Sequence, residues 1–403
     1  MTLEVVKQKS RGFICVNAHP EGCRANIERQ IDMVAARPPA GRSGSDSPAI
    51  RNVLVVGAST GYGLASRIAA GWGLQAKTLG IFFERLPDRG RTASAGFYNT
   101  VAVHQRAKKD GLHAASLNGD AFSDELKREA AETIRKEFAP IDLVIYSLAS
   151  PRRTDSRTGT TYQSALKPVG QAYSSRTIDL DSERVTEVTI EPASEQEVSD
   201  TIAVMGGNDW KQWIEMLLGE NLLAAGARTL AYSYIGPEMT WPIYRDGTIG
   251  QAKKDLDRVA GELNGALRNR LGGRAWVSVN KAIVTQASAA IPVVPLYMSI
   301  LMKVMQAKSV EEGAIEQIDR LFRDFLAGGG EIRIDPAGRI RLDDREMRPE
   351  VQREVSAVWP TVTTENLHQV SDFAGFKRHF QNLFGFEVAG VDYAEPTEIE
   401  LTW

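Results

Sequence analysis

Short apolar runs alternate with longer amphipathic segments through most of the chain. Runs that read as buried strands lie at 53–56, 78–83, 114–121, 141–146, 228–236 and 275–280. Segments with helical spacing of apolar residues lie at about 90–110, 123–138, 210–223 and 248–271. Strand–helix alternation of this kind is typical of parallel sheets built from right-handed crossovers. It predicts an α/β protein with a Rossmann-type, doubly wound parallel sheet and helices on both faces.

Three segments fall outside this alternation and enlarge the predicted fold. Residues 1–50 hold a short strand, a helix at about 20–36 and a Ser/Gly/Pro-rich linker, so we expect an N-terminal extension. Within the main domain, 51–308, an insertion at about 152–210 reads as a β-hairpin and a helix opened by the capping-box pair Ser194 and Glu197. We expect this insertion to form a lid or wall over the active-site edge of the sheet. Residues 309–403 predict a peripheral helical extension with a hairpin at 331–343.

The turn after the first strand is rich in glycine. It reads Gly57, Ala58, Ser59, Thr60, Gly61, Tyr62 and Gly63, and a helical pattern follows. Glycines let a backbone approach a pyrophosphate, and the free N–H groups of the helix start then face the anion. The G-x-x-x-G-x-G spacing is the variant found in short-chain dehydrogenase/reductases. It predicts a dinucleotide site, although ordinary strand–helix corners also use such turns.

The second strand ends at Phe83 and Glu84. An acidic side chain there accepts hydrogen bonds from the adenosine ribose hydroxyls and repels a 2′-phosphate, which favours NADH over NADPH. Arg85 follows directly and offers the opposite possibility, a partner for that phosphate. A solvated carboxylate at a strand end is the plainer interpretation of Glu84.

Two later strand ends complete the predicted cofactor site. Asp120 and Ala121 follow the third strand, where Asp120 is placed either to accept from the adenine amino group or to cap the next helix. Leu148 and Ala149 follow the fourth strand among small residues, which leave room for the ribose and nicotinamide side of the cofactor.

Charge and cysteine usage narrow the class of protein. Lys and Arg total 48 against 51 for Asp and Glu, so the net charge of −3 favours neither nucleic acid nor an anionic membrane. Cys15 and Cys23 make a disulfide framework improbable, no secretory h-region is present, and we expect a cytoplasmic protein. The five histidines form no metal-ligand spacing, so we expect no metal. The apolar region 284–305 is broken by two prolines and a lysine, which argues against membrane insertion.

The predicted acid is a tyrosine, because His and Cys offer no catalytic set. Tyr244 lies in a loop before a helix, and Lys253 lies nine positions later on that helix. A lysine there would bind the nicotinamide ribose, and its charge would lower the pKa of the tyrosine. Tyrosine–lysine pairs at such spacings also arise by chance.

Together these motifs resemble the V-type enoyl-acyl-carrier-protein reductases (FabV) and the related trans-2-enoyl-CoA reductases. The resemblance rests on the Tyr-x8-Lys spacing, on the turn 57–63 and on motifs at 12–15, 83–84, 118–121, 146–152, 232–236, 240–244, 284–288 and 382–386. It extends over essentially the whole chain. The main departure is the longer linker at 37–48, which holds no site residue.

The resemblance implies NADH-dependent reduction of the trans-2 double bond of an enoyl thioester in fatty-acid biosynthesis. By matching position, Tyr244 is the proton donor, Lys253 holds the cofactor ribose and Tyr234 contacts the substrate. Ile283, Val284 and Thr285 hold the nicotinamide end, and Glu84 discriminates against NADPH. The apolar helix 294–307, with Met298, Met302 and Met305, offers a deformable wall for an acyl chain or is plain core packing.

Two other functions share parts of this pattern. A short-chain-type carbonyl or sugar-nucleotide oxidoreductase would use the same cofactor turn, but its Tyr-x3-Lys spacing fails because position 248 is Thr. A non-catalytic NADH-sensing protein would not need Tyr244 and Lys253. The substrate carrier, CoA or acyl carrier protein, stays open. Large insertions let one chain close its own site, so we expect a monomer.

Overall fold

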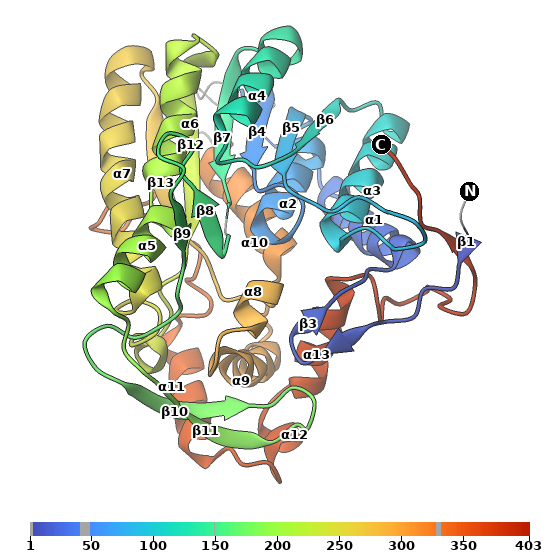
Figure 1. The fold of residues 1–403 in the computed structure, drawn as a ribbon, viewed down its shortest axis with the longest axis vertical. Helices are drawn as coiled ribbons and strands as arrows, with labels where there is room; N and C mark the ends of the chain where they lie inside the picture. The colour runs from blue at the N-terminus through green and yellow to red at the C-terminus, as the bar shows by residue number, and fades with distance from the viewer. Residues whose placement is uncertain (1–2, 41–48, 149, 328–331) are drawn as a thin grey trace.

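The computed structural model describes residues 3–40, 49–148, 150–327 and 332–403, which are built around one seven-stranded sheet (Figure 1). The strand order is β14-β13-β12-β7-β4-β5-β6, and every neighbouring pair is parallel. The strands are β4 (Asn52–Val56), β5 (Lys77–Phe82), β6 (Ala114–Asn118), β7 (Ile141–Tyr146), β12 (Leu223–Ser233), β13 (Arg274–Val279) and β14 (Ile340–Arg341). The predicted Rossmann-type sheet is confirmed.

Helices cover both faces of the sheet because alternate strand residues are apolar on each side. Val53 and Val55 pack in one buried cluster, whereas Leu54 and Val56 pack in another. The first cluster is covered by α1 (Pro20–Ala35), α2 (Gly61–Ile68), α3 (Ala95–Lys109) and α10 (Ala314–Arg320). The second is covered by α4 (Asp124–Glu137), α6 (Asn208–Gly219) and α7 (Thr248–Leu271).

Local signals set the bounds of the long helices. Helix α7 ends at Gly272, whose φ of +68° suits glycine, and Arg268 and Arg270 lie in its last turn near the negative end of the helix dipole. Helix α2 continues into a π-helical turn, Ala69–Gly73, and α10 continues into another, Leu321–Leu326. The predicted bounds of α7 and of α9 (Val294–Ala307) match the structure.

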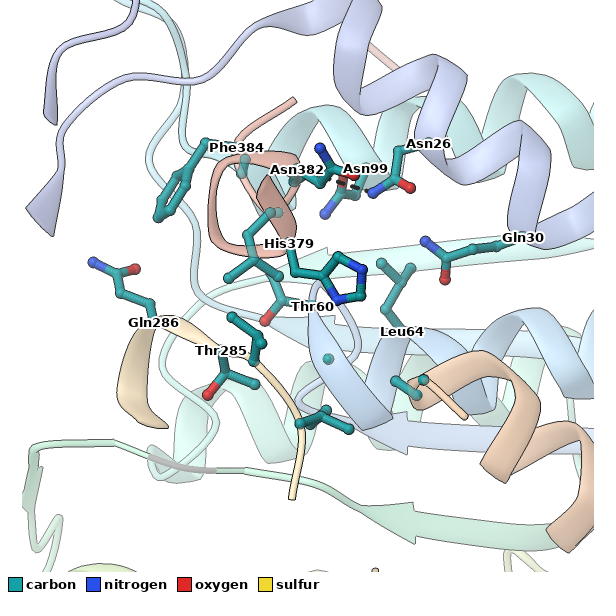
Figure 2. A pocket seen from close by; sticks show the side chains of 18 of the residues that line it. Asn26, Gln30, Thr60, Leu64, Asn99, Thr285, Gln286, His379, Asn382 and Phe384 are labelled. Carbon is teal, nitrogen blue, oxygen red and sulfur yellow. Dashed lines mark hydrogen bonds between the residues drawn. The ribbon is translucent and has the colours of Figure 1, made fainter. Parts of the chain in front are cut away.

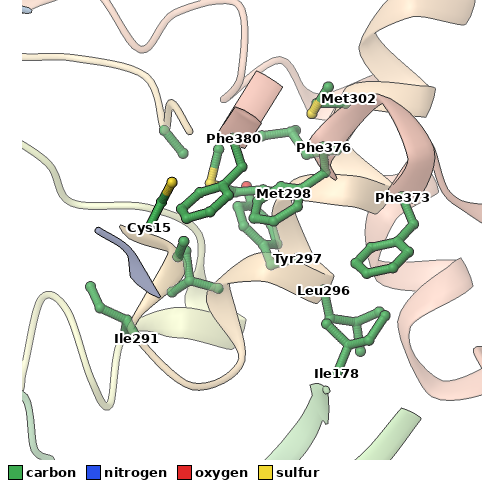
Figure 3. Close-up of a cluster of buried hydrophobic side chains, with 14 of the residues drawn as sticks. Cys15, Ile178, Ile291, Leu296, Tyr297, Met298, Met302, Phe373, Phe376 and Phe380 are labelled. Atoms are coloured by element: carbon green, nitrogen blue, oxygen red, sulfur yellow. The ribbon is translucent and has the colours of Figure 1, made fainter. Parts of the chain in front are cut away.

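A third buried cluster lies beyond the carboxyl ends of the strands (Figure 3). Helix α9 is its centre, with Leu296, Tyr297 and Met298 all almost fully buried. The surrounding helices are α8 (Gln286–Ala289), α11 (Pro349–Val358), α12 (Leu367–Val370) and α13 (Phe373–Asn382). Residues 309–403 therefore help to build the core beside the active-site edge. The sequence pattern had predicted a peripheral extension, and that prediction is wrong.

The insertion contains the predicted hairpin, β10 (Tyr173–Ile178) paired with β11 (Val185–Ile190). The capping box of Ser194 and Glu197 opens α5 (Glu195–Met205), as predicted. A second, smaller hairpin, β8 (Arg152–Thr154) with β9 (Thr161–Gln163), was not predicted. Strand β10 contacts α9, so the insertion lies against the third cluster, in the lower part of Figure 1.

The hairpin predicted at 331–343 is wrong for the residues that the structure describes. Ile340 and Arg341 form β14 and pair in parallel with Ser278 and Val279 of β13, so this stretch is the edge of the central sheet. Residue 331 lies outside the described residues, as does most of the predicted linker. At the chain ends, β1 (Leu3–Glu4) pairs with β15 (Thr397–Glu398), and β2 (Ser10–Arg11) pairs with β3 (Ile14–Cys15).

Candidate active site

The sheet reverses its winding between β4 and β7, which are neighbours although they are far apart in the chain. Open α/β sheets bind ligands outside the carboxyl ends of their strands at such a switch point. A cavity of about 970 Å³ lies there. Figure 2 shows Thr60, Leu64 and Thr285 around part of it, with His379 between Thr60 and Leu64. Asn26, Gln30, Asn382 and Phe384 also line it.

The glycine turn brings three backbone segments together more closely than any side chain permits. A Cβ on Gly57 would lie 2.4 Å from the carbonyl oxygen of Ser147, and one on Gly63 would lie 1.9 Å from that of Gly57. Gly57 and Gly61 also have φ of +88° and +53°. The Thr60 side chain makes no cap hydrogen bond, so the first N–H groups of α2 stay available. This cradle fits the pyrophosphate of a dinucleotide.

Glu84 is held in place at the end of β5. Its carboxylate accepts a hydrogen bond from Ser59 Oγ at 2.6 Å, and its backbone N–H donates to Asn118 Oδ1 at 2.7 Å. A Cβ on Gly96 would lie 2.0 Å from the carboxylate, so Gly96 leaves the room that Glu84 occupies. Arg85 instead donates to the carbonyl oxygens of Val16 and Thr92. Phe83 beside it is 78% exposed.

Asp120 and Ala121 lie in the turn after β6. Asp120 is exposed and accepts from the backbone N–H of Phe122, while Ser123 caps α4, so the helix-cap alternative for Asp120 is wrong. The buried Lys127 supports this turn by donating to the carbonyl oxygens of Ala121 and Phe122 and pairing with Asp209 at 2.8 Å. The turn is therefore held from behind by a fully paired lysine.

The remaining predicted cofactor residues occupy the same edge of the sheet. Ile283, Val284 and Thr285 line the cavity beside Thr60 and Gly61. Leu148 is half-buried, and its backbone nitrogen lies 3.0 Å from the position of a Cβ on Gly57. Ala149 lies outside the described residues. Tyr62 does not line the cavity. Its hydroxyl donates to the carbonyl oxygen of Lys281 at 2.6 Å.

The predicted catalytic pair lies at the end of β12. Tyr244 is 8% exposed, and its ring meets that of Tyr234 edge-on at 4.7 Å between centroids. Lys253 donates from Nζ to the carbonyl oxygen of Tyr232 at 3.0 Å. Burial lowers the pKa of Lys253 to about 8.

The pKa of Tyr244 differs from the sequence-based expectation. Burial raises it above the ordinary value, and the negative charge of Glu346 raises it further. The expectation of a lowered pKa is wrong for this structure because desolvation outweighs any effect of Lys253. Among the described residues, Tyr244 and Lys253 share no hydrogen bond.

Several residues at this site were missed by sequence reasoning. Glu346 is fully buried and accepts a hydrogen bond from Tyr234 at 2.9 Å. It comes from the run Asp343-Asp344-Arg345-Glu346, which reads as a solvated surface, so the sequence carries no signal for it. His379, on α13, and Phe384, just after that helix, also line the cavity. Met298 and Met302 line the cavity as well as the core, whereas Met305 belongs to the core alone.

Within the described ranges, no group of three His, Cys, Asp or Glu side chains is arranged to hold a metal ion. In the same part of the chain, no helix is both long and apolar enough to span a bilayer.

Three family models match the chain in succession. The NAD(P)H binding domain of trans-2-enoyl-CoA reductase matches residues 5–89, and the trans-2-enoyl-CoA reductase catalytic region matches 91–327. A model described as the enoyl reductase FAD binding domain matches 334–397.

The segment that matches the FAD model does not fit a flavin dinucleotide. Residues 334–397 are all described, and in them no strand leads through a glycine-rich turn into a helix, unlike 52–68. The inward side chains of α11 and α13, such as Val351, Val355, Phe373 and Phe376, are fully packed in the third cluster. We therefore derive no step through a flavin.

Relatives with assigned names are similar over nearly the whole chain. An enoyl-(acyl-carrier-protein) reductase (NADH) of Flavobacterium johnsoniae is 52% identical over 98% of this chain and 97% of its own. A protein of the same name from Pseudomonas aeruginosa is 51% identical over 97% and 96%.

Solved structures agree in fold. The trans-2-enoyl-CoA reductase of Clostridium acetobutulicum in complex with NADH is 43% identical, with a TM-score of 0.94 and 98% of each chain covered. The Treponema denticola enzyme in complex with NAD is 45% identical, with a TM-score of 0.93 and the same coverage. Motifs, fold and near-complete matches agree, and the chain belongs to the family of trans-2-enoyl-CoA and V-type enoyl-acyl-carrier-protein reductases.

Proposed function

We propose that this protein uses NADH to reduce the trans-2 double bond of an enoyl thioester to the saturated acyl thioester in fatty-acid biosynthesis. One observation carries the proposal: the glycine cradle, Glu84 and the Tyr234–Tyr244–Lys253 group share the carboxyl edge of one sheet. The names of the relatives support both the thioester substrate and the reduced cofactor.

The chain holds NADH, in this proposal, with its phosphates on the cradle of Gly57, Gly61 and Gly63. Glu84 accepts from the adenosine ribose hydroxyls, and its charge disfavours a 2′-phosphate. Asp120 and Ala121 border the adenine, while Leu148, Ala149 and the 283–285 segment flank the nicotinamide end. Lys253 binds the nicotinamide ribose. The cofactor supplies a hydride to the β carbon of the substrate.

Tyr244 has the second chemical role. As the β carbon gains the hydride, negative charge develops on the thioester oxygen, and the Tyr244 hydroxyl stabilises that oxygen and donates its proton. Its raised pKa means that the tyrosine keeps this proton until the charge develops. Tyr234 contacts the substrate beside it. Met298 and Met302 offer flexible apolar surface to the acyl chain.

The remaining assignments concern the whole protein. We propose that 51–308 is the catalytic domain on which 1–50 and 309–403 pack, since α10 contacts α2 directly. We also propose a monomer, because the large insertions let one chain close its own site, and sedimentation at more than one chain's mass would contradict this. The free, buried thiols of Cys15 and Cys23 support the cytoplasm. CoA or acyl carrier protein presents the thioester.

The reaction is tested by following NADH consumption with crotonyl-CoA, in parallel with NADPH. We expect the wild type to oxidise NADH and to prefer it to NADPH. Tyr244→Phe should lose roughly 10²–10⁴-fold in kcat, the usual contribution of a positioned acid, while NADH affinity stays unchanged. A wild type that binds NADH but leaves the thioester intact would favour the sensor or the carbonyl reductase instead.

Activity should also depend on the charge of Lys253. Its pKa of about 8 means that the ammonium is intact below that pH and is lost as the pH rises through it. We therefore expect kcat/KM to fall above about pH 8. In Lys253→Arg, the charge persists, so the fall should move to higher pH even if the overall rate is lower. If kcat/KM of Lys253→Arg fell at the same pH as that of the wild type, the fall would be due to the titration of another group.

The cradle can be tested separately from the chemistry. In Gly63→Ala, the new methyl group would overlap the carbonyl oxygen of Gly57, so α2 must shift away from β4. We expect NADH affinity, measured by fluorescence titration, to weaken at least about tenfold. Gly71→Ala is the matched control, because a Cβ there meets nothing within 4 Å, and its affinity should equal the wild type. Equal affinities for both variants would contradict the cradle.

A further inference from the structure

Glu346 is a fully buried carboxylate at the boundary between the active site and the C-terminal segment. Its Oε1 accepts hydrogen bonds from the hydroxyls of Tyr234, at 2.9 Å, and Tyr297, at 2.7 Å. Its Oε2 accepts from the backbone N–H of Ala282 at 2.8 Å. Burying a carboxylate is costly unless donors surround it, and here three donors do.

These three donors belong to different parts of the site. Tyr234 follows β12, Ala282 directly precedes the cavity-lining 283–285 segment, and Tyr297 lies on α9 beside Met298. One carboxylate thus ties together the substrate tyrosine, the segment at the nicotinamide end and the apolar helix. A displaced Glu346 would release all three at once.

The hydrogen bond to Glu346 also determines how the two active-site tyrosines meet. Glu346 holds the hydroxyl of Tyr234 by a hydrogen bond. The ring planes of Tyr234 and Tyr244 meet at 82°, so the two rings pack edge to face. The orientation of Tyr244 therefore depends on that of Tyr234. The negative charge of Glu346 favours the neutral form of both phenols, after burial itself.

Within the described residues, no cation forms a direct ion pair with Glu346. Lys281 is the adjacent cation, but its Nζ pairs with Glu311 at 3.1 Å and donates to the carbonyl oxygen of Ala282. The other ionisable groups on which the charge of Glu346 acts are Tyr234, Tyr297, Tyr62 and, through its ring contact with Tyr234, Tyr244. Its charge thus acts mainly on tyrosines.

We propose that Glu346 is a positioning residue for the reduction, which acts through Tyr234 to hold Tyr244 and the 282–285 segment in their working places. The inference rests on the proposed function, since Tyr244 is the proton donor there. Glu346 itself touches neither substrate nor cofactor in this proposal.

Glu346→Gln tests this role with little change in shape. The amide oxygen must face the N–H of Ala282, so the NH₂ group faces the two tyrosines and donates to them, which reverses the direction of those hydrogen bonds. We expect kcat with crotonyl-CoA to fall at least about tenfold, while NADH affinity changes less than about twofold. The hydroxyls of Tyr234 and Tyr244 should ionise at lower pH than in the wild type because a negative charge is gone, which the difference in alkaline tyrosine absorbance between the two proteins would report.

A double-mutant cycle separates positioning from general destabilisation. If Glu346 acts through Tyr234, the Glu346→Gln/Tyr234→Phe double variant should be no slower than the slower single variant, within about twofold. Asp343→Asn is the matched control. It removes another buried carboxylate of the same segment, paired with Arg341 at 2.6 Å, and should lower thermal stability without changing kcat or the tyrosine titration.

Four results would count against the proposal. Multiplicative losses in the double variant, or an Asp343→Asn defect in kcat equal to that of Glu346→Gln, would reduce Glu346 to a structural role. A Glu346→Gln variant with wild-type kcat would overturn the inference and leave the proposed function standing. A wild type that consumes no NADH with crotonyl-CoA would overturn both.

Discussion

The approach of backbone to backbone at the switch point is the constraint on which the site depends. Helix α2 can begin directly against β4 only because Gly63 and Gly57 carry no side chains, and β4 can meet the end of β7 only because of Gly57. That contact sets where the first N–H groups of α2 point. It also sets the place of Tyr62, whose hydroxyl anchors the backbone at Lys281 and thus the start of the cavity-lining segment. The proposed phosphate cradle and the proposed nicotinamide-binding segment are thus consequences of one packing geometry.

Burial controls the electrostatics around this frame. Desolvation moves the pKa of Lys253 down and that of Tyr244 up, so each group is displaced towards its neutral form. In the proposed reaction, the cofactor and substrate bring hydroxyl groups and a developing negative charge into this dry region. Ionised forms are then stabilised only where those partners lie, which is how a preorganised polar site distinguishes the transition state from the free enzyme.

The sequence was most informative where the physical signal is local. Each of the confirmed features depends on residues that are close together in the sequence. They are the glycine turn, the helical periodicity of α7 and α9, and the capping box at Ser194. Contacts between segments far apart in the chain could not be predicted from the sequence. The alternation around Ile340 suits a hairpin or an edge strand equally, and only the exposed edge of β13 selects the second.

The candidate site shows the same division. The structure brings the predicted cofactor residues that it describes to one edge of the sheet, because that edge is where strand ends meet. Glu346 escaped notice since a charged run has no signature of burial until three distant donors surround it. The predicted lowering of the Tyr244 pKa was wrong for a related reason. The Tyr-x8-Lys spacing does not show that the tyrosine is buried away from water.

The carboxylate of Glu346 also bears on how the protein comes into being on the ribosome. The glycine turn and the strands that flank it leave the exit tunnel early, and their contacts are available once β7 has been made. Tyr234, Ala282 and Tyr297 must wait for a residue synthesised much later. A nascent chain thus passes through a stage that holds all residues of the proposed nucleotide cradle but not all residues of the proposed reaction centre. The three contacts of Glu346 are thus among the last of the site that synthesis makes available, and their long separation in sequence adds to the loop-closure entropy that folding must meet.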